Sequence, residues 1–243
     1  MKSKGPACRR ALFVVQSGMA NGNLFLVSVP IGNLKDITLR AIETLKQTDV
    51  LIAEDTRQAG KLLLLLGIEH KNMLSYRDQN HEQMLPRISE ILASGKSAAL
   101  ISDRGTPTIS DPGYKLVRDL MQQGFNIIPI PGPVAAIAAL TASGLPTDKF
   151  SFLGFLPKSS GKQAELLEKF GKLSATFIIY ESPFRVIKLL ETIRKVLGEI
   201  PVSAIHELTK VNETVVTGKV SEVLEKLKTQ KPKGEWVVLG RYS

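Results

Sequence analysis

The fold is decided by one stretch, Ser102-Asp103-Arg104-Gly105-Thr106-Pro107-Thr108-Ile109-Ser110-Asp111-Pro112-Gly113, which stands between an apolar run at 98–101 and a helical pattern at 114–121. It holds two glycines, two prolines, two aspartates and four hydroxyl side chains. Glycine reaches backbone angles that other residues avoid, and proline restrains φ and removes a donor. Such a loop at the carboxyl end of a strand is typical of a ligand-binding wall in an open α/β sheet. An ordinary strand-to-helix connection with capping residues explains it equally well at this point.

Strands and helices alternate around this loop. Short apolar runs predict strands buried on both faces at 24–29, 49–53, 73–76, 97–101 and 125–130. Helical spacing of apolar residues predicts helices at 38–47, 61–66, 81–94, 114–123 and 134–143. The alternation predicts a mostly parallel sheet whose strand ends converge on one edge, where their loops share a cleft.

The second half of the chain begins after the break at Gly144-Leu145-Pro146-Thr147-Asp148. Strands are predicted there at 150–156, 176–180, 201–206, 213–217 and 235–241, with helices at 162–171, 182–197 and 221–228. The expected fold class is therefore α/β in two domains. We expect a disordered extension at 1–22, an N-terminal α/β domain at 23–145 and a smaller mixed α/β domain at 146–243.

The charge of the chain is distributed unevenly. The formal net charge is +9, from 32 basic and 23 acidic residues. Residues 1–10 hold four basic and no acidic groups, residues 11–149 hold 13 of each, and residues 150–243 hold 15 basic and 10 acidic. A basic half beside a neutral half indicates a polyanionic partner, with nucleic acid first, although a generally basic surface also fits.

Several site types and a membrane span are not expected. A single cysteine, Cys8, excludes an internal disulfide framework, and the three scattered histidines give no metal site. No apolar run approaches the roughly 20 residues of a membrane span. The first strand is not followed by G-x-G-x-x-G, and there is no complete P-loop, so neither phosphate-binding motif is present. The residues alone predict a medium-sized polar ligand bound between two domains.

Eight blocks in order resemble a known family. Four lie in the first half: residues 29–38 (VPIGNLKDIT), 53–57 (AEDTR), the loop at 102–113, and 131–133 (PGP). Four lie in the second: residues 154–157 (GFLP), 180–185 (YESPFR), 207–210 (ELTK) and 233–235 (KGE). Together they resemble the tetrapyrrole-methylase superfamily, the class III S-adenosylmethionine (SAM) methyltransferases, and within it the ribosomal RNA small subunit methyltransferase I family.

This resemblance implies a two-domain tetrapyrrole-methylase-like fold with SAM as cofactor in the interdomain cleft. It implies a cytoplasmic homodimer that transfers the SAM methyl group to the ribose 2′-hydroxyl of a cytidine in the decoding region of 16S rRNA. The partner would be small-subunit rRNA or the assembled 30S subunit, which agrees with the basic second half.

The resemblance also implies a cofactor site. Its expected residues lie in three loops: Pro30, Gly32, Asp103, Gly105, Thr106, Pro131, Gly132 and Pro133. Glycine lets the backbone approach the ligand, and Asp103 is expected to hold its cationic amino group unless it only caps its own loop.

The candidate catalytic residues are Asp103, Glu54, Glu207 and Lys210, because a ribose hydroxyl gains from a general base or a nearby cation. The sequence does not choose among them. Arg57, Arg185 and Lys210 are the candidate substrate-binding residues, with the segment at 54–57 as a polar floor near the acceptor. Helix capping by Asp55 or Thr56, and a Glu207–Lys210 ion pair that only stabilises the domain, are the structural alternatives.

The chain departs from the family pattern at four positions. Arg104 stands where the family usually has alanine, Phe184 where it has histidine, His206 where it has arginine, and Val134 where a small residue is common. We predict that Arg104 points outward to RNA and that activity survives. The alternatives are a tetrapyrrole (corrinoid) ring methylase and, if Arg104 blocks the cofactor, an inactive ribosome- or RNA-binding relative.

Overall fold

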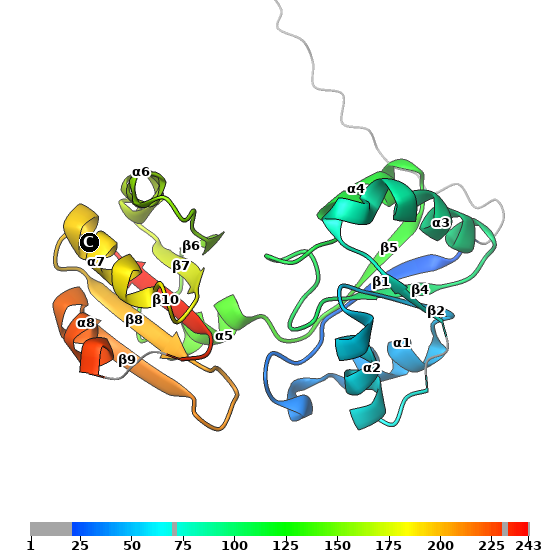
Figure 1. Cartoon of the computed structure of the whole chain (residues 1–243), viewed down its shortest axis with the longest axis horizontal. Helices are drawn as coiled ribbons and strands as arrows, with labels where there is room; N and C mark the ends of the chain where they lie inside the picture. The colour runs from blue at the N-terminus through cyan, green and yellow to red at the C-terminus, as the bar shows by residue number, and fades with distance from the viewer. Residues whose placement is uncertain (1–20, 70–71, 230–232, 243) are drawn as a thin grey trace, which may run out of the picture.

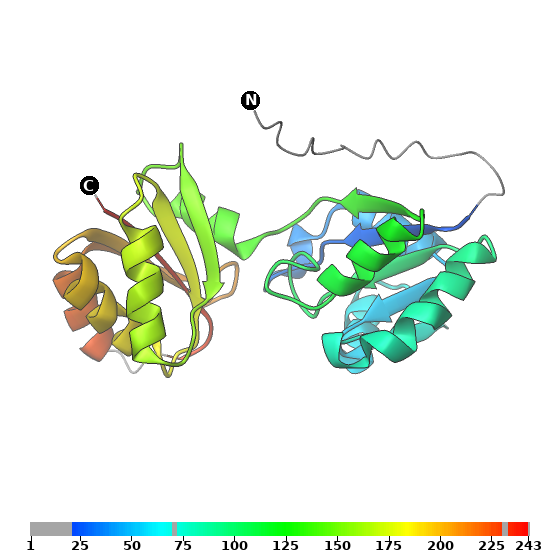
Figure 2. The same ribbon diagram turned by 90° about the horizontal axis from the view of Figure 1, so that it is seen from above.

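The computed structural model describes residues 21–69, 72–229 and 233–242. Most of the expected extension at 1–22, including Cys8, lies outside the described residues. Each half of the chain builds a five-stranded sheet, and the two sheets form separate bodies that one segment after β5 connects (Figures 1 and 2). Nowhere in the described ranges is a helix both long and apolar enough to cross a membrane.

The first sheet has the order β3-β2-β4-β1-β5, and every pairing in it is parallel. Its strands are β1 (Asn23–Val27), β2 (Val50–Ala53), β3 (Met73–Ser75), β4 (Ala98–Ile101) and β5 (Asn126–Ile130). The central strands β2 and β4 are buried along their whole length, as their continuous apolar runs predict.

Two pairs of helices cover the faces of this sheet. Helices α1 (Leu39–Gln47) and α2 (Thr56–Leu65) pack on one face through Ala41, Leu45, Ala59 and Leu63. Helices α3 (His81–Ala93) and α4 (Tyr114–Gln122) pack on the other through a core that includes Ile88, Leu92, Leu116 and Leu120. The loops at the carboxyl ends of the strands are thus the part of this layered domain left open to a ligand.

The second sheet has the order β6-β7-β10-β8-β9 and is mixed, because only the β6–β7 pair is parallel. Its strands are β6 (Phe150–Phe155), β7 (Thr176–Glu181), β8 (Pro201–His206), β9 (Thr214–Lys219) and β10 (Trp236–Arg241). Helices α6 (Ser160–Gly171), α7 (Val186–Leu197) and α8 (Val220–Thr229) share one core with this sheet. The mixed α/β character predicted for this half is confirmed.

Helix α5 (Ala135–Ala142) belongs by packing to the second sheet. Its Ala136, Ala139 and Leu140 join a core with Ile178 and Leu239. The backbone N–H of Ala136 also donates to the Tyr180 hydroxyl at 2.9 Å. The expected boundary at 145/146 would leave this helix with the first domain, so we propose that the boundary lies instead at residues 131–133.

The predicted helices are present, and local sequence explains where two of them begin. Thr38 accepts a hydrogen bond from the Ala41 N–H at the start of α1, and Asp55 accepts one from the Arg57 N–H at the start of α2. Helix α2 therefore starts five residues before the run predicted at 61–66. Asp55 is a helix cap, as one of the two readings of the 54–57 segment expects.

Candidate functional site

The three loops expected to hold a cofactor meet at the carboxyl edge of the first sheet. Val29 and Gly105 exchange two backbone hydrogen bonds of 2.8 and 3.1 Å, which tie the loop after β4 to the end of β1. A hydrogen bond of 2.8 Å joins the hydroxyls of Ser28 and Thr106, and Thr106 donates to the Pro133 carbonyl at 3.0 Å. The three segments that the sequence predicts to form one site therefore lie together at this edge of the sheet.

The loop at 102–113 has an unusual backbone. Gly105 adopts φ +71, and a Cβ there would lie 3.3 Å from Ile31, so glycine suits both the angle and the space. Thr108 and Ser110 have φ values of 73 and 62 although they are not glycine. Such strain persists only where the surroundings enforce it, and it clusters at ligand sites.

A second strained loop, residues 207–210, approaches from the other domain. Glu207 and Thr209 have φ values of 50 and 65. The turn at Gly32 fits against this loop so closely that a Cβ on Gly32 would lie 2.6 Å from Cγ of Lys210. The two domains are therefore in contact at one side of the cleft.

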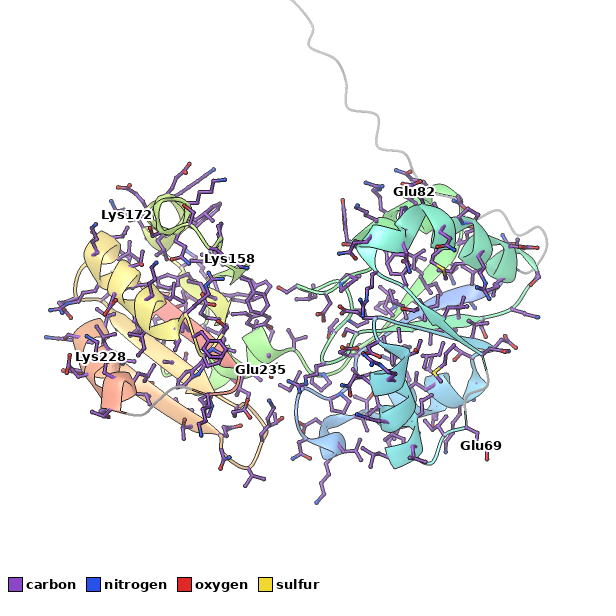
Figure 3. The ribbon with its side chains drawn as sticks, viewed as in Figure 1. Glu69, Glu82, Lys158, Lys172, Lys228 and Glu235 are labelled. Carbon is purple, nitrogen blue, oxygen red and sulfur yellow. The ribbon has the colours of Figure 1, made fainter. Side chains whose placement is uncertain are left out.

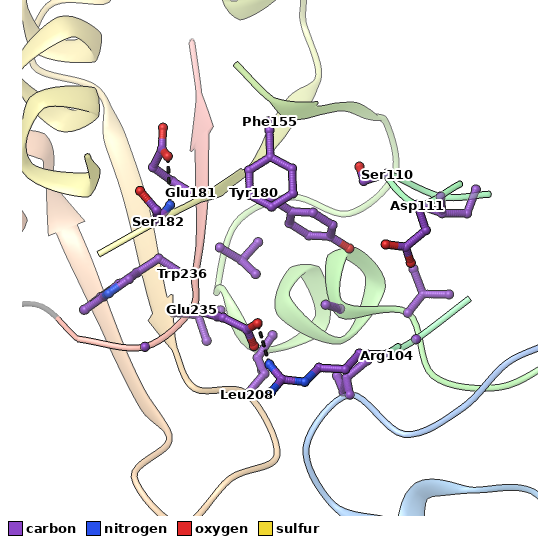
Figure 4. A pocket seen from close by; sticks show the side chains of 18 of the residues that line it. Arg104, Ser110, Asp111, Phe155, Tyr180, Glu181, Ser182, Leu208, Glu235 and Trp236 are labelled. Carbon is purple, nitrogen blue, oxygen red and sulfur yellow. Dashed lines mark hydrogen bonds and ion pairs between the residues drawn. The ribbon is translucent and has the colours of Figure 1, made fainter. Parts of the chain in front are cut away.

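A cavity of about 380 Å³ lies between the two strained loops (Figure 4). The first half of the chain contributes Arg104, Gly105, Thr106, Ile109, Ser110 and Asp111 to its walls, with Ile31 and Val134 beside them. The second half contributes Phe155, Tyr180, Glu181, Leu208, Glu235 and Trp236, among others. Of the expected cofactor residues, Gly105 and Thr106 line the cavity. The others, Pro30, Gly32, Asp103, Pro131, Gly132 and Pro133, are not among its lining residues.

Asp111 is the cavity-lining carboxyl group with a marked shift in pKa. Burial raises its pKa from 3.8 to about 6, the Ser102 hydroxyl partly offsets this, and the charges of Glu54 and Asp103 add to the rise. A carboxylate with a pKa near 6 is a suitable proton acceptor at neutral pH. Asp111 lies in the 102–113 loop, but no sequence pattern predicted a function for it.

The candidates Glu54 and Asp103 lie together outside the cavity lining. Asp103 accepts a hydrogen bond of 3.3 Å from the Asp55 N–H, so its carboxylate contacts the loop after β2 rather than capping its own loop. Burial, and then the charge of Asp103, raise the pKa of Glu54. The exposed Arg57 pairs with Asp55 at 2.7 Å and holds the pKa of that carboxyl well below its usual range.

Glu207 and Lys210 form an ion pair of 2.8 Å, and the same ammonium group contacts Glu235 at 3.0 Å. The hydrogen bond from Lys210 lowers the pKa of Glu207. Glu207 also accepts from the backbone N–H of Glu235 at 2.9 Å. This pair stabilises the turn before β10, as the structural alternative expects.

Arg185 is held within its own domain. It lies 3.2 Å from the buried carboxylate of Glu181 and donates to the carbonyls of Leu156 and Pro157 at 2.8 and 3.1 Å. These contacts tie the loop after β7 to the loop after β6. The candidate substrate-binding residue Arg185 thus pairs with an acidic side chain of its own domain.

The prediction that Arg104 points outward is wrong. Its guanidinium reaches across the cleft, where Nη1 donates to Oε1 of Glu235 at 2.5 Å, and both side chains line the cavity (Figure 4). Glu235 follows Arg104 by 131 residues, so no local sequence pattern could predict this ion pair.

None of the other cavity residues in the second half of the chain was predicted to have a function. Phe155, Tyr180, Glu181, Leu208 and Glu235 lie in blocks that resemble the family, and this was their only signal. Trp236 has only the pattern of a strand residue. Their common role became visible only when the carboxyl end of β6, the end of β7 and the start of β10 met at the cavity.

Comparisons with known proteins agree with the resemblance of the eight sequence blocks. A family model described as tetrapyrrole (corrin/porphyrin) methylases matches residues 23–224. A protein of Halalkalibacterium halodurans named ribosomal RNA small subunit methyltransferase I is 45% identical over 218 residues, covering 90% of this chain and 75% of the relative. The Vibrio cholerae protein of that name is 45% identical over 219 residues, covering 89% and 76%.

Solved structures share the fold. The uroporphyrin-III C-methyltransferase of Thermus thermophilus, complexed with S-adenyl homocysteine, aligns with a TM-score of 0.62 at 19% identity. The alignment covers 90% of this chain and 97% of that one. At this identity the likeness establishes the two-domain fold.

Proposed function

This chain belongs to the tetrapyrrole (corrin/porphyrin) methylase family, and we propose that it methylates the ribose 2′-hydroxyl of a cytidine in the decoding region of 16S rRNA, with SAM as donor. The methyltransferase activity follows from the family. The rRNA substrate is supported by relatives that share their name and 45% of aligned residues with this chain. The observation that carries the proposal is the cavity between the two domains, because most of its lining residues lie in the blocks that resemble the family.

The cavity has the size and the charge that SAM requires. Its volume of about 380 Å³ falls within the range of small-molecule sites. The carboxyl groups of Asp111 and Glu235 suit a ligand that carries a sulfonium and an ammonium group, whereas the buried carboxylate of the lining residue Glu181 is paired with Arg185. The apolar surfaces of Phe155, Tyr180 and Trp236 suit an adenine ring and exclude water.

SAM supplies an electrophilic methyl group, which moves to the ribose oxygen as the carbon–sulfur bond breaks and the sulfonium becomes a neutral thioether. The residues of this chain must then orient the two reactants and remove the hydroxyl proton. Asp111 is the proton acceptor in this proposal, because it lines the cavity and its pKa of about 6 leaves it ionised at neutral pH. Glu54 and Asp103, candidates from the sequence, act through Asp111 by raising its pKa.

The second domain presents features that suit RNA. Lys172 and Lys228 lie on its outer side, whereas Glu235 faces the cleft (Figure 3). Phe184, which directly follows the cavity residue Pro183, is 94% exposed and offers a stacking surface for an unpaired base. The family resemblance further supports a homodimer that acts in the cytoplasm.

Incubation with tritiated SAM tests the proposal. Unmodified 30S subunits, deproteinised 16S rRNA and a corrin precursor are compared as acceptors. We expect label in RNA, recovered as 2′-O-methylcytidine after digestion to nucleosides. Label in the corrin alone would assign the chain to ring methylation, and RNA binding without label would make it an inactive relative; both outcomes contradict the proposal.

A further inference from the structure

The cavity has an uneven set of charges. Among its lining residues in the described part of the chain, Asp111, Glu181 and Glu235 are acidic and Arg104 alone is basic. The amino-acid end of SAM carries an ammonium and a carboxylate, so carboxyl groups match the first and only a cation matches the second. Arg104 is the one charged side chain on these walls with that chemistry.

We propose that Arg104 binds the carboxylate of the methyl donor, and that Glu235 holds the guanidinium in place until the donor arrives. The inference rests on the proposed function, since it names a residue that positions SAM. Arginine suits this role because its planar group pairs with a carboxylate through two parallel hydrogen bonds.

The backbone that carries Arg104 is well anchored. The Arg104 carbonyl accepts a hydrogen bond of 2.8 Å from Ser102 Oγ. In the next residue, the Gly105 N–H donates to Val29 and the Gly105 carbonyl accepts from Val29. Exchange of Glu235 for a ligand carboxylate therefore needs only rotation of the side chain. The loop that shapes the site can stay in place.

The resting ion pair is easy to exchange. The side chains of Arg104 and Glu235 are 53% and 62% exposed, and exposed ion pairs contribute little to stability. Glu235 also keeps a partner when Arg104 leaves, because its other oxygen lies 3.0 Å from Nζ of Lys210. The exchange therefore leaves the Glu235 carboxylate with a cationic partner.

A phosphate of RNA is the competing partner for this guanidinium. The structure favours the donor, because Arg104 lines the cavity wall and is directed across the cleft toward Glu235 rather than away from it (Figure 4). The two partners predict different losses when Arg104 is replaced, so one set of variants separates them.

Calorimetric titration tests the inference with two donors, SAM and decarboxylated SAM, which lacks only the carboxylate. The full-length chain is compared with Arg104→Ala and Glu235→Gln. Arg118→Ala is the matched control, because Arg118 is also a half-exposed arginine in an ion pair but does not line the cavity. Binding of 30S subunits is measured in parallel.

We expect Arg104→Ala to weaken SAM binding at least about tenfold, because the variant loses the charge-assisted pair with the SAM carboxylate. Binding of decarboxylated SAM should change by no more than about twofold, because that donor has no carboxylate to form the pair. Glu235→Gln should leave SAM binding unchanged or tighter, because it removes a competitor. The inference is overturned if Arg104→Ala tightens SAM binding, weakens both donors equally, or weakens only 30S binding. If neither donor binds any variant or the unchanged chain, the proposed function fails as well.

Discussion

Replacement of Asp111 by asparagine is expected to stabilise the folded protein and to slow methyl transfer at the same time. Asp111 is half-buried in the cavity wall, and burial raises its pKa from 3.8 to about 6. At pH 8 the folded protein must therefore hold an ionised carboxylate where it is poorly solvated. Asparagine has nearly the same shape and does not ionise, so this cost disappears.

The size of the effect follows from the pKa. A rise of about two units corresponds to about 3 kcal/mol, at 1.36 kcal/mol for each unit. Because the side chain is only half-buried, solvent screening reduces this to about 1.5 kcal/mol, or about 4 °C in melting temperature for a chain of this length.

The stability gained by Asp111→Asn increases with pH. A carboxyl group whose pKa is raised in the folded state contributes full stability below its unfolded pKa of 3.8, and this contribution is lost as the pH rises through about 6. The advantage of Asp111→Asn is therefore greatest at pH 8. It falls to about a third of that value at pH 4.5 and vanishes at lower pH.

Thermal unfolding at pH 8 and pH 4.5 measures the stability, and single-turnover methyl transfer measures the chemistry. We expect transfer at saturating SAM to fall about 100-fold or more in Asp111→Asn, as for loss of a general base. The rate of the unchanged chain should rise with pH around a midpoint near 6, and the variant should lack this rise. Asp148→Asn is the control, because Asp148 is exposed and lies outside the cavity lining. A lower melting temperature for Asp111→Asn at pH 8, or an equal gain at both pH values, would refute the reasoning.

Two further substitutions test the surrounding structure. Gly32→Ala would place a Cβ 2.6 Å from Cγ of Lys210 and should weaken SAM binding about tenfold by displacing the 207–210 loop. Gly60→Ala in α2, where the nearest atom is 3.9 Å away, is the control and should leave SAM affinity unchanged. Equal affinities of the two variants in calorimetry would contradict this prediction. Tyr76→Phe removes the hydroxyl bonded to His81 at 2.9 Å and should lower the free energy of unfolding in urea by about 1–3 kcal/mol. SAM affinity should not change in Tyr76→Phe, since this pair does not line the cavity, and a weaker affinity would count against the assigned site.

Local patterns were sufficient for the secondary structure and for the parallel type of the first sheet. Strands such as β2 and β4 are apolar throughout because they are buried on both faces, and that burial is written directly in consecutive residues. The helix start at Asp55 is equally local, because a capping side chain bonds an N–H two or three residues away. The convergence of the loops also follows, since the ends of parallel strands meet on one edge.

Packing between distant segments decided the rest. Helix α5 is alanine-rich, and its sequence does not say which sheet it will cover. The direction of Arg104 depends on a glutamate 131 residues later, and the pKa of Asp111 depends on burial, on Asp103 in the same loop and on the distant Glu54. Electrostatic energies depend on the three-dimensional distances between charges and on their solvation. The order of residues along the chain therefore predicted the loops of this site, but not which charged groups meet in it.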